Sequence, residues 1–246
     1  MTTSLDRFSG HADLYAQYRI DYPAELYAFV LSQVSTRQRA WDCATGNGQV
    51  AGVLADYFTH VEATDISQAQ LNQAIQRPNI RYAISGAEKT PFADASFDLV
   101  TVGQALHWFD VPTFNAEVGR VLKPGGVVAE WGYGLNQVGP VIDELVLDFY
   151  QNQVGAYWDT ARRHTEDEYA QLPFPFAGVQ QTAFVIRRVW SGERFLNYLR
   201  TWSSVQNYIL QHQLDPVDRL SEQLIRVWGP GEREVRFPVF LRLGRV

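Results

Sequence analysis

Short apolar runs alternate with longer segments of helical periodicity through the first half of the chain. The runs are bounded by turn residues, which is typical of buried strands, and they predict strands at 39–43, 60–66, 80–85, 97–103 and 125–134. Elsewhere apolar residues recur every three or four positions, which predicts helices at 24–34, 48–58, 68–76 and 111–122. Strands and helices that alternate in this way indicate an α/β fold with a parallel sheet.

The pattern changes after Gly134. Helical periodicity covers 140–158, 192–209 and 215–229, and two more apolar runs predict strands at 181–190 and 234–246. These two strands are too few for a second sheet. We therefore expect a single domain over 1–246, in which 136–178 forms a helical insertion or lid.

Composition narrows the class of protein. The formal net charge is −6 and the pI is about 5.4, which argues against an extended phosphate-binding face and therefore against a nucleic-acid partner. The chain has no signal-peptide pattern at its start, and no apolar run reaches the roughly 18 residues of a membrane span. Its one cysteine, Cys43, cannot form an internal disulfide. These features predict a cytoplasmic protein with no membrane partner.

Aromatic residues make up 13% of the chain, which fits either a large core or a pocket for a flat, apolar ligand. Composition alone does not choose between the two.

The stretch "WDCATGNGQ" at 41–49 places Gly46 and Gly48 on either side of Asn47, between a predicted strand and a predicted helix. A strand, a glycine-rich turn and a helix start favour an anionic or polar ligand at the sheet edge. Asp65 ends the next strand, 19 residues after Gly46 (65 − 46), where a carboxylate accepts ribose hydroxyls. Alternatively, Asp65 caps the following helix beside Ser67.

The glycine motif fits two cofactors. "GNGQVA" at 46–51 matches the G-x-G-x-x-A fingerprint of NAD sites. Read one register earlier, Ala44, Gly46 and Gly48 give a G-x-G-x-G variant that suits an adenosyl-sulfonium cofactor. The motif alone leaves both open.

Motifs further along the chain decide between them. They occur in the order "YAQYRIDYP", the glycine stretch, "GAEKTPF", "FDLV", "QALHWFD" and "RVLKPGG". In this order they resemble the class I S-adenosylmethionine-dependent methyltransferases, and more narrowly the small-molecule branch that includes trans-aconitate methyltransferases. The resemblance covers residues 11–134. It implies a Rossmann-like, doubly wound sheet of about seven strands, mostly parallel with an antiparallel last strand, preceded by an N-terminal helical segment.

The resemblance also implies which residues bind S-adenosylmethionine. Those implied at the methionine part are Asp42, Ala44, Gly46 and Gly48, those at the ribose and adenine are Asp65, Ile66, Ala87 and Glu88, and those at the sulfonium and carboxylate ends are Gln104, Tyr15 and Arg19. Ala44 departs from the pattern, because the family usually has glycine there. If this position needs a positive φ, alanine costs about 1 kcal/mol.

The acceptor side of the reaction is less defined. His107 is the candidate general base because its ordinary pKa is near neutrality, although it also fits a buried histidine packed beside Trp108 and Phe109. Candidates for an apolar substrate pocket are Trp108, Tyr133, Trp158 and Trp202. Arg162, in "ARRH", could bind an acidic group, or that stretch could be a solvated helix face balanced by nearby acids.

The predicted function is methyl transfer to the carboxylate or hydroxyl of a small molecule by in-line displacement, in a monomer or homodimer without a bound metal. One alternative is an NAD-dependent oxidoreductase, although "GQALHWFD" offers no Tyr–Lys pair for hydride transfer. A second alternative is a non-catalytic methyltransferase-like binding protein.

Overall fold

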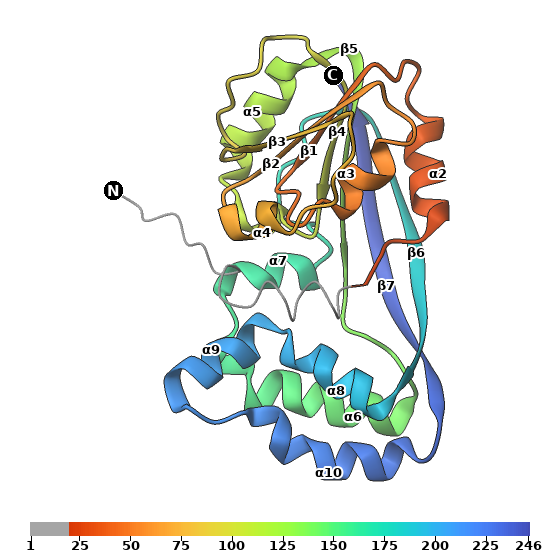
Figure 1. Cartoon of the computed structure of the whole chain (residues 1–246), viewed down its shortest axis with the longest axis vertical. Coiled ribbons are helices and arrows are strands. Elements are labelled where there is room, and N and C mark those ends of the chain that lie inside the picture. Colours follow the sequence, from red (N-terminus) through yellow and green to blue (C-terminus); the bar gives the residue numbers. More distant parts are fainter. Residues whose placement is uncertain (1–19) are drawn as a thin grey trace.

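A single seven-stranded sheet organises the molecule, which a computed structural model describes from residue 20 to residue 246. The strands lie in the order β3-β2-β1-β4-β5-β7-β6 (Figure 1). Their bounds are β1 Arg39–Cys43, β2 His60–Asp65, β3 Ile80–Ile84, β4 Phe97–Gly103, β5 Leu122–Tyr133, β6 Ala177–Ser191 and β7 Glu232–Arg245. The first five strands pair in parallel, and β7 is antiparallel to both β5 and β6. The predicted fold class is confirmed.

Helices cover both faces of the parallel strands, as in a doubly wound sheet. On β1, Ala40 belongs to the core cluster that includes α2 (Ala24–Ser32) and α3 (Gln49–Leu54). Trp41 points to the other face, into the cluster that includes α5 (Val111–Val121). This alternation follows from the two-residue period of a strand. A further short helix, α4 (Gln68–Asn72), follows β2.

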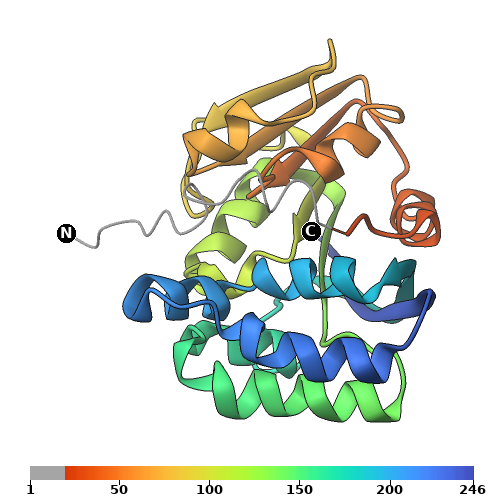
Figure 2. The ribbon, with the colours of Figure 1, turned by 60° about the horizontal axis from the view of Figure 1, so that its bottom comes forward.

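A layer of helices lies below the carboxyl ends of the parallel strands (Figure 1). These helices come from two segments of the chain: α6 (Pro140–Asp148) and α7 (Arg163–Glu166) precede β6, while α8 (Gly192–Arg200), α9 (Ser203–His212) and α10 (Pro216–Trp228) lie between β6 and β7. Helix α10 packs against both α6 and α8, as Figure 2 also shows. The long strands β6 and β7 run from the sheet down to this layer.

Two helices predicted as continuous are interrupted. The predicted helix 192–209 breaks at Trp202, whose backbone is extended and begins α9. The predicted helix 140–158 gives way after α6 to a π-helical turn over Phe149–Gln153 and then to a 3₁₀ turn at Gly155–Tyr157. Periodicity did not reveal either break, because the apolar positions continue across both.

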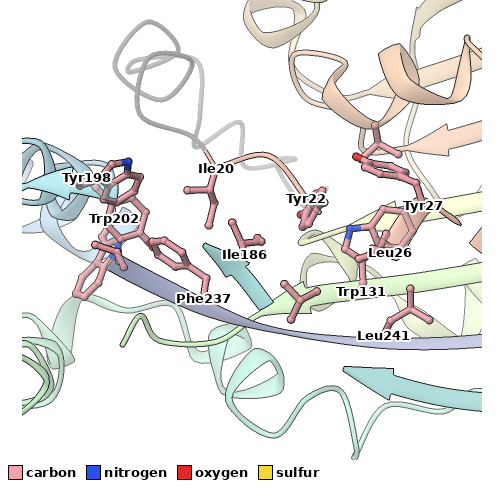
Figure 3. Close-up of a cluster of buried hydrophobic side chains, with 14 of the residues drawn as sticks. Ile20, Tyr22, Leu26, Tyr27, Trp131, Ile186, Tyr198, Trp202, Phe237 and Leu241 are labelled. Carbon is pink, nitrogen blue, oxygen red and sulfur yellow. The ribbon is translucent and has the colours of Figure 1, made fainter. Parts of the chain in front are cut away.

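One hydrophobic cluster joins the sheet to the helical layer. It contains residues of α2, β5, β6, β7, α8 and α10. Figure 3 shows Tyr198 and Trp202 near Phe237 at one end and Trp131 with Tyr27 at the other. Within residues 20–246, no helix has the length and apolarity needed to cross a membrane.

Candidate functional site

The loop from Ala44 to Gly48 connects β1 to α3 and is left-handed at three positions. The φ values are 53° at Ala44, 58° at Gly46 and 80° at Gly48. Ala44 therefore meets the condition under which alanine costs about 1 kcal/mol. At Gly48 a side chain is excluded by packing as well, because a Cβ atom would lie 2.3 Å from the Tyr82 hydroxyl. The glycine at this position thus serves the fold of the loop in addition to any ligand.

Asp42 organises this loop from the end of β1. Its side chain is buried, and it accepts hydrogen bonds from the Ala51 amide at 3.1 Å, from the Thr101 hydroxyl at 2.9 Å and from the Thr45 hydroxyl. The carboxylate therefore holds the loop to α3 and to β4.

Asp65 joins the two loops at the sheet edge. Its carboxylate accepts the amide of Gly46 at 2.8 Å and the amide of Ser67, also at 2.8 Å. Ser67 in turn caps α4 by accepting the Gln70 amide at 3.4 Å. Asp65 thus also helps to form the N-terminus of α4, as the alternative interpretation of this residue predicts.

The other predicted cofactor residues surround this edge. Ile66, which follows Asp65, is 46% exposed. Ala87 is buried, and Glu88 accepts the Asp110 amide at 3.1 Å. Gln104, with a φ of 57°, accepts the Tyr133 amide at 2.7 Å and so ties the end of β4 to the end of β5. Tyr15 and Arg19 lie outside the described residues.

His107 lies in a 3₁₀ turn (Leu106–Trp108) that follows β4, and only 7% of its surface is exposed. Its Nδ1 lies 3.3 Å from the Thr165 hydroxyl and 3.4 Å from the Tyr169 hydroxyl, and its ring packs beside Trp108. Burial, together with the charges of Arg162 and His164, lowers the pKa of His107 to about 3. The imidazole is neutral at physiological pH and is a weak base.

A cavity of about 670 Å³ opens between the residues that follow β5, the middle of β7 and residues 147–168. We call it the acceptor cavity. Its wall is formed by Gly134, Leu135, Leu147, Tyr150, Gln151, Gly155, Trp158, Asp159, Thr160, Arg162, Arg163, Thr165, Glu166, Glu168, Pro238 and Phe240. The turn that carries His107 contacts the turn Thr160–Arg162 in this wall. The cavity therefore adjoins the loop after β4.

The predicted substrate residues are partly brought together. Trp158 and Arg162 line the cavity, with the Arg162 guanidinium carbon 4.5 Å from the centre of the Trp158 ring. Trp202 lies behind Trp158, with 5.6 Å between ring centres. Trp108 and Tyr133 do not form this wall; Tyr133 packs against Phe237.

The two arginines of the "ARRH" stretch differ in exposure. Arg163 is exposed and Arg162 is half-buried, and both contribute to the cavity wall. Tyr150 is a wall residue that the sequence reasoning missed. Its ring lies 4.8 Å from that of Trp158, and it sits on the π-helical turn. The sequence carried no clear signal for it, because the helices of this protein also bury neighbouring apolar positions, such as Leu26 with Tyr27.

The side chain of Arg242 joins the segment 136–178 to the sheet beneath this wall. Arg242 on β7 donates from Nε to Glu130 on β5 at 2.7 Å, and from Nη1 to the carbonyls of Tyr169 and Leu172 at 2.9 Å. Both charged side chains are buried. Burial raises the pKa of Glu130 to about 7, against the lowering effect of Arg242. We call this set of contacts the Arg242 latch.

Comparison with known proteins identifies the class of this site. Residues 41–129 match the family model described as a methyltransferase domain. A Dictyostelium discoideum protein named as a candidate methyltransferase is 29% identical over 98% of this chain and 95% of its own length. A solved structure from Anaeromyxobacter dehalogenans, described as a candidate type II methyltransferase, superposes with a TM-score of 0.84 at 36% identity. That match covers 93% of this chain and 98% of the other.

A more distant structure shares the fold alone. It is a phosphoethanolamine N-methyltransferase of Haemonchus contortus bound to phosphomonomethylethanolamine and S-adenosylhomocysteine, with a TM-score of 0.51 at 17% identity over 94% of this chain and 56% of that one. The family model and the near-complete match to the Anaeromyxobacter protein decide between the two cofactors that the glycine motif left open. The chain belongs to the class I S-adenosylmethionine-dependent methyltransferases.

Proposed function

We propose that the protein transfers the methyl group of S-adenosylmethionine to an oxygen of a small molecule, a carboxylate or a hydroxyl, bound in the acceptor cavity. The observation that carries this proposal is the cavity itself. Its volume of about 670 Å³ is of the size that holds a small organic molecule, and it adjoins the loop after β4. Trans-aconitate-like methyltransferases remain the branch we propose by resemblance.

The cofactor residues are proposed on the chemistry of the loops. The left-handed backbone from Ala44 to Gly48 presents a surface without bulky side chains, and Asp65 supplies an acceptor-only carboxylate for hydroxyl donors. The exposed Ile66 is the apolar surface on which a flat base would pack. When bound, S-adenosylmethionine supplies an electrophilic methyl group on a cationic sulfur. These residues, with Asp42, Ala87, Glu88 and Gln104, bind and orient it.

The chain's own contribution to the reaction is alignment and exclusion of water. As the bond between the acceptor oxygen and the methyl carbon forms, the bond between that carbon and sulfur breaks, and its electron pair remains on sulfur. A carboxylate releases no proton in this step, whereas a hydroxyl must lose one. His107 is proposed to border the reacting groups, and its low pKa suits an acceptor that needs no base. The segment 136–178 is proposed as the lid over the acceptor.

Titration of the protein with S-adenosylhomocysteine by calorimetry tests this function. We expect micromolar binding to the wild type and at least tenfold weaker binding to Asp65→Asn, because a charge-assisted hydrogen bond to the ribose is worth roughly 1.5–3 kcal/mol. Asp56→Asn is the matched control, since Asp56 is an exposed carboxylate in the turn after α3. Urea unfolding separates a loss of ligand from a loosened loop, because Asp65 also holds Gly46 and Ser67. Absence of binding to the wild type would refute the proposal.

A further inference from the structure

Arg162 is a cation without a carboxylate partner in the wall of the acceptor cavity. Its Nε donates to the Tyr150 hydroxyl at 3.4 Å, and its guanidinium stacks on Trp158. Within residues 20–246 no carboxylate oxygen lies within 4.0 Å of its nitrogens, although Arg120, Arg200 and Arg242 all have such partners. A guanidinium that lines a cavity without a protein carboxylate has its fork of donors available for an anionic ligand.

The side chains around Arg162 fix its orientation. The Tyr150 hydroxyl donates a short hydrogen bond to Glu166, so its oxygen is left to accept from Arg162 Nε. With Nε engaged and one face on Trp158, the two terminal nitrogens form the edge that remains available. They make no hydrogen bond to any described residue, and unlike Arg242 Nη2 they are not among the buried atoms without a partner. This edge is the one with which arginine binds a carboxylate through two parallel bonds.

The π-helical turn is a second, independent feature of this wall. Tyr150 lies on the turn Phe149–Gln153, which adds a residue to the helical repeat after α6, and both Phe149 and Tyr150 are buried. Such turns are rare and frequently mark functional sites. Here the turn delivers the hydroxyl that positions Arg162.

The charges of the wall limit the ligand to one negative group. Burial opposes ionisation of Arg162, but the phenols of Tyr150, Tyr133 and Tyr198 hold its pKa above the ordinary value, so it stays cationic. The cavity wall also contains Asp159, Glu166 and Glu168, with Arg163 as the second cation. A ligand with several negative charges would meet these acids, and an amine would meet Arg162. The apolar remainder of the ligand has Trp158, Leu135 and Phe240 to pack against.

We propose that Arg162, stacked on Trp158 and oriented by Tyr150, binds the carboxylate of a small monocarboxylic acid with a flat apolar body. This inference rests on the proposed function, because it names the class of molecule that occupies the acceptor cavity. Tyr150 acts as a positioning residue, while Arg162 is the residue that determines specificity.

The test measures binding instead of turnover. Protein saturated with S-adenosylhomocysteine is titrated with trans-cinnamate, phenylacetate and indole-3-acetate, and with the neutral primary amide of each. We expect at least one acid to bind, and its amide to bind at least tenfold more weakly. Arg162→Gln should weaken that acid by roughly 10- to 100-fold, the value of a charge-assisted hydrogen bond. Arg162→Lys should recover only part of the affinity, because lysine lacks the planar fork.

An exposed arginine outside the cavity wall provides the matched control. Because Arg163 also lines the cavity, the control is Arg219→Gln, which removes the same charge from an exposed side chain on α10 outside the cavity wall and should leave acid binding unchanged. Tyr150→Phe removes the hydroxyl and keeps the ring, so it should weaken the acid less than Arg162→Gln does. Unfolding midpoints within a few degrees of the wild type confirm that the variants are folded.

Several outcomes would overturn the inference. They are an absence of binding by all three acids, equal binding of the amides, equal loss in Arg219→Gln, or tighter binding of phenyl phosphate than of the acids. Failure of S-adenosylhomocysteine to bind the wild type would instead overturn the proposed function. A protein that binds S-adenosylhomocysteine and methylates neutral hydroxyl compounds but ignores the acids would overturn this inference alone.

Discussion

Two buried regions of this molecule are each built around an arginine, and they differ in how completely that arginine is satisfied. In the Arg242 latch, the guanidinium bonds to Glu130 and to two backbone carbonyls, and it lies 4.6 Å from the Phe174 ring. In the acceptor cavity, Arg162 lies 4.5 Å from the Trp158 ring but has one hydrogen bond and no carboxylate among the described residues. Both arginines stack on an aromatic ring, so stacking does not distinguish them.

The difference indicates separate roles. The latch joins β5 and β7 to the connector that contains Tyr169 and Leu172, and so holds the wall of the cavity to the sheet. The hydrogen bonds of Arg242 are made to other residues of the protein. Arg162 keeps two terminal nitrogens unbonded next to an open cavity, which is expected where the partner is a ligand. The first arginine should therefore matter for stability, and the second for binding.

The largest expected effect is on the free energy of unfolding when the latch is broken. Arg242→Met leaves the Glu130 carboxylate buried without a partner and frees two carbonyls, which should cost about 3–5 kcal/mol. Arg162→Met should change stability by less than about 1 kcal/mol, because it breaks no ion pair. Urea denaturation at pH 7.5 measures both.

The double variant Glu130→Leu/Arg242→Met sharpens this result. Replacing both charges should recover much of the loss, since a buried ion pair exchanged for packed apolar groups is often neutral. An Arg162→Met variant as unstable as Arg242→Met would mean that Arg162 is structural, and the comparison would fail.

These two regions also show what the sequence could and could not predict. The order of strands and helices, the glycine loop and Asp65 follow from local patterns, and the structure places Gly46 and Asp65 in direct contact. Nothing in the sequence distinguishes the neighbouring residues Arg162 and Arg163, and only the local fold after the turn Thr160–Arg162 leaves one half-buried and the other exposed. Arg242 and Glu130 lie 112 residues apart on strands whose pairing no local pattern specifies. Contacts of this kind depend on the tertiary fold.

The second expected effect is on the pKa of His107, which reports the charge of Arg162. Burial and then the Arg162 charge lower this pKa to about 3. Below about pH 6.5 the unfolded chain gains a proton at His107 that the folded protein does not, so folding stability should fall as the pH drops. The expected loss is about 1.4 kcal/mol per pH unit, or about 2 kcal/mol between pH 6.5 and 5. His107→Asn should lack this component in urea denaturation at the two pH values.

The comparison predicts how the arginines act on that histidine. The NMR titration of the His107 ring should move to higher pH in Arg162→Gln, although burial keeps its pKa below 6.5. It should stay in place in Arg163→Gln, because Arg163 is not among the groups that shift it. A ring that titrates near pH 6.5 in the wild type would show that His107 is more accessible than the structure has it, and would restore it as a candidate base.

The smallest expected effect concerns Tyr169, the residue that touches both regions. Its carbonyl accepts from Arg242, while its hydroxyl lies 3.4 Å from His107 Nδ1. Tyr169→Phe removes only the hydroxyl and preserves both the carbonyl and the ring that packs edge-on against Phe240. Because a contact of 3.4 Å is a weak hydrogen bond, the loss of unfolding free energy should be below about 1 kcal/mol, with acid binding unchanged. Thermal unfolding and the cinnamate titration measure the two quantities. If Tyr169→Phe instead lowered stability as much as Arg242→Met, the Tyr169 hydroxyl would couple the contacts of Arg242 to the cavity wall. The two arginines would then belong to one coupled unit.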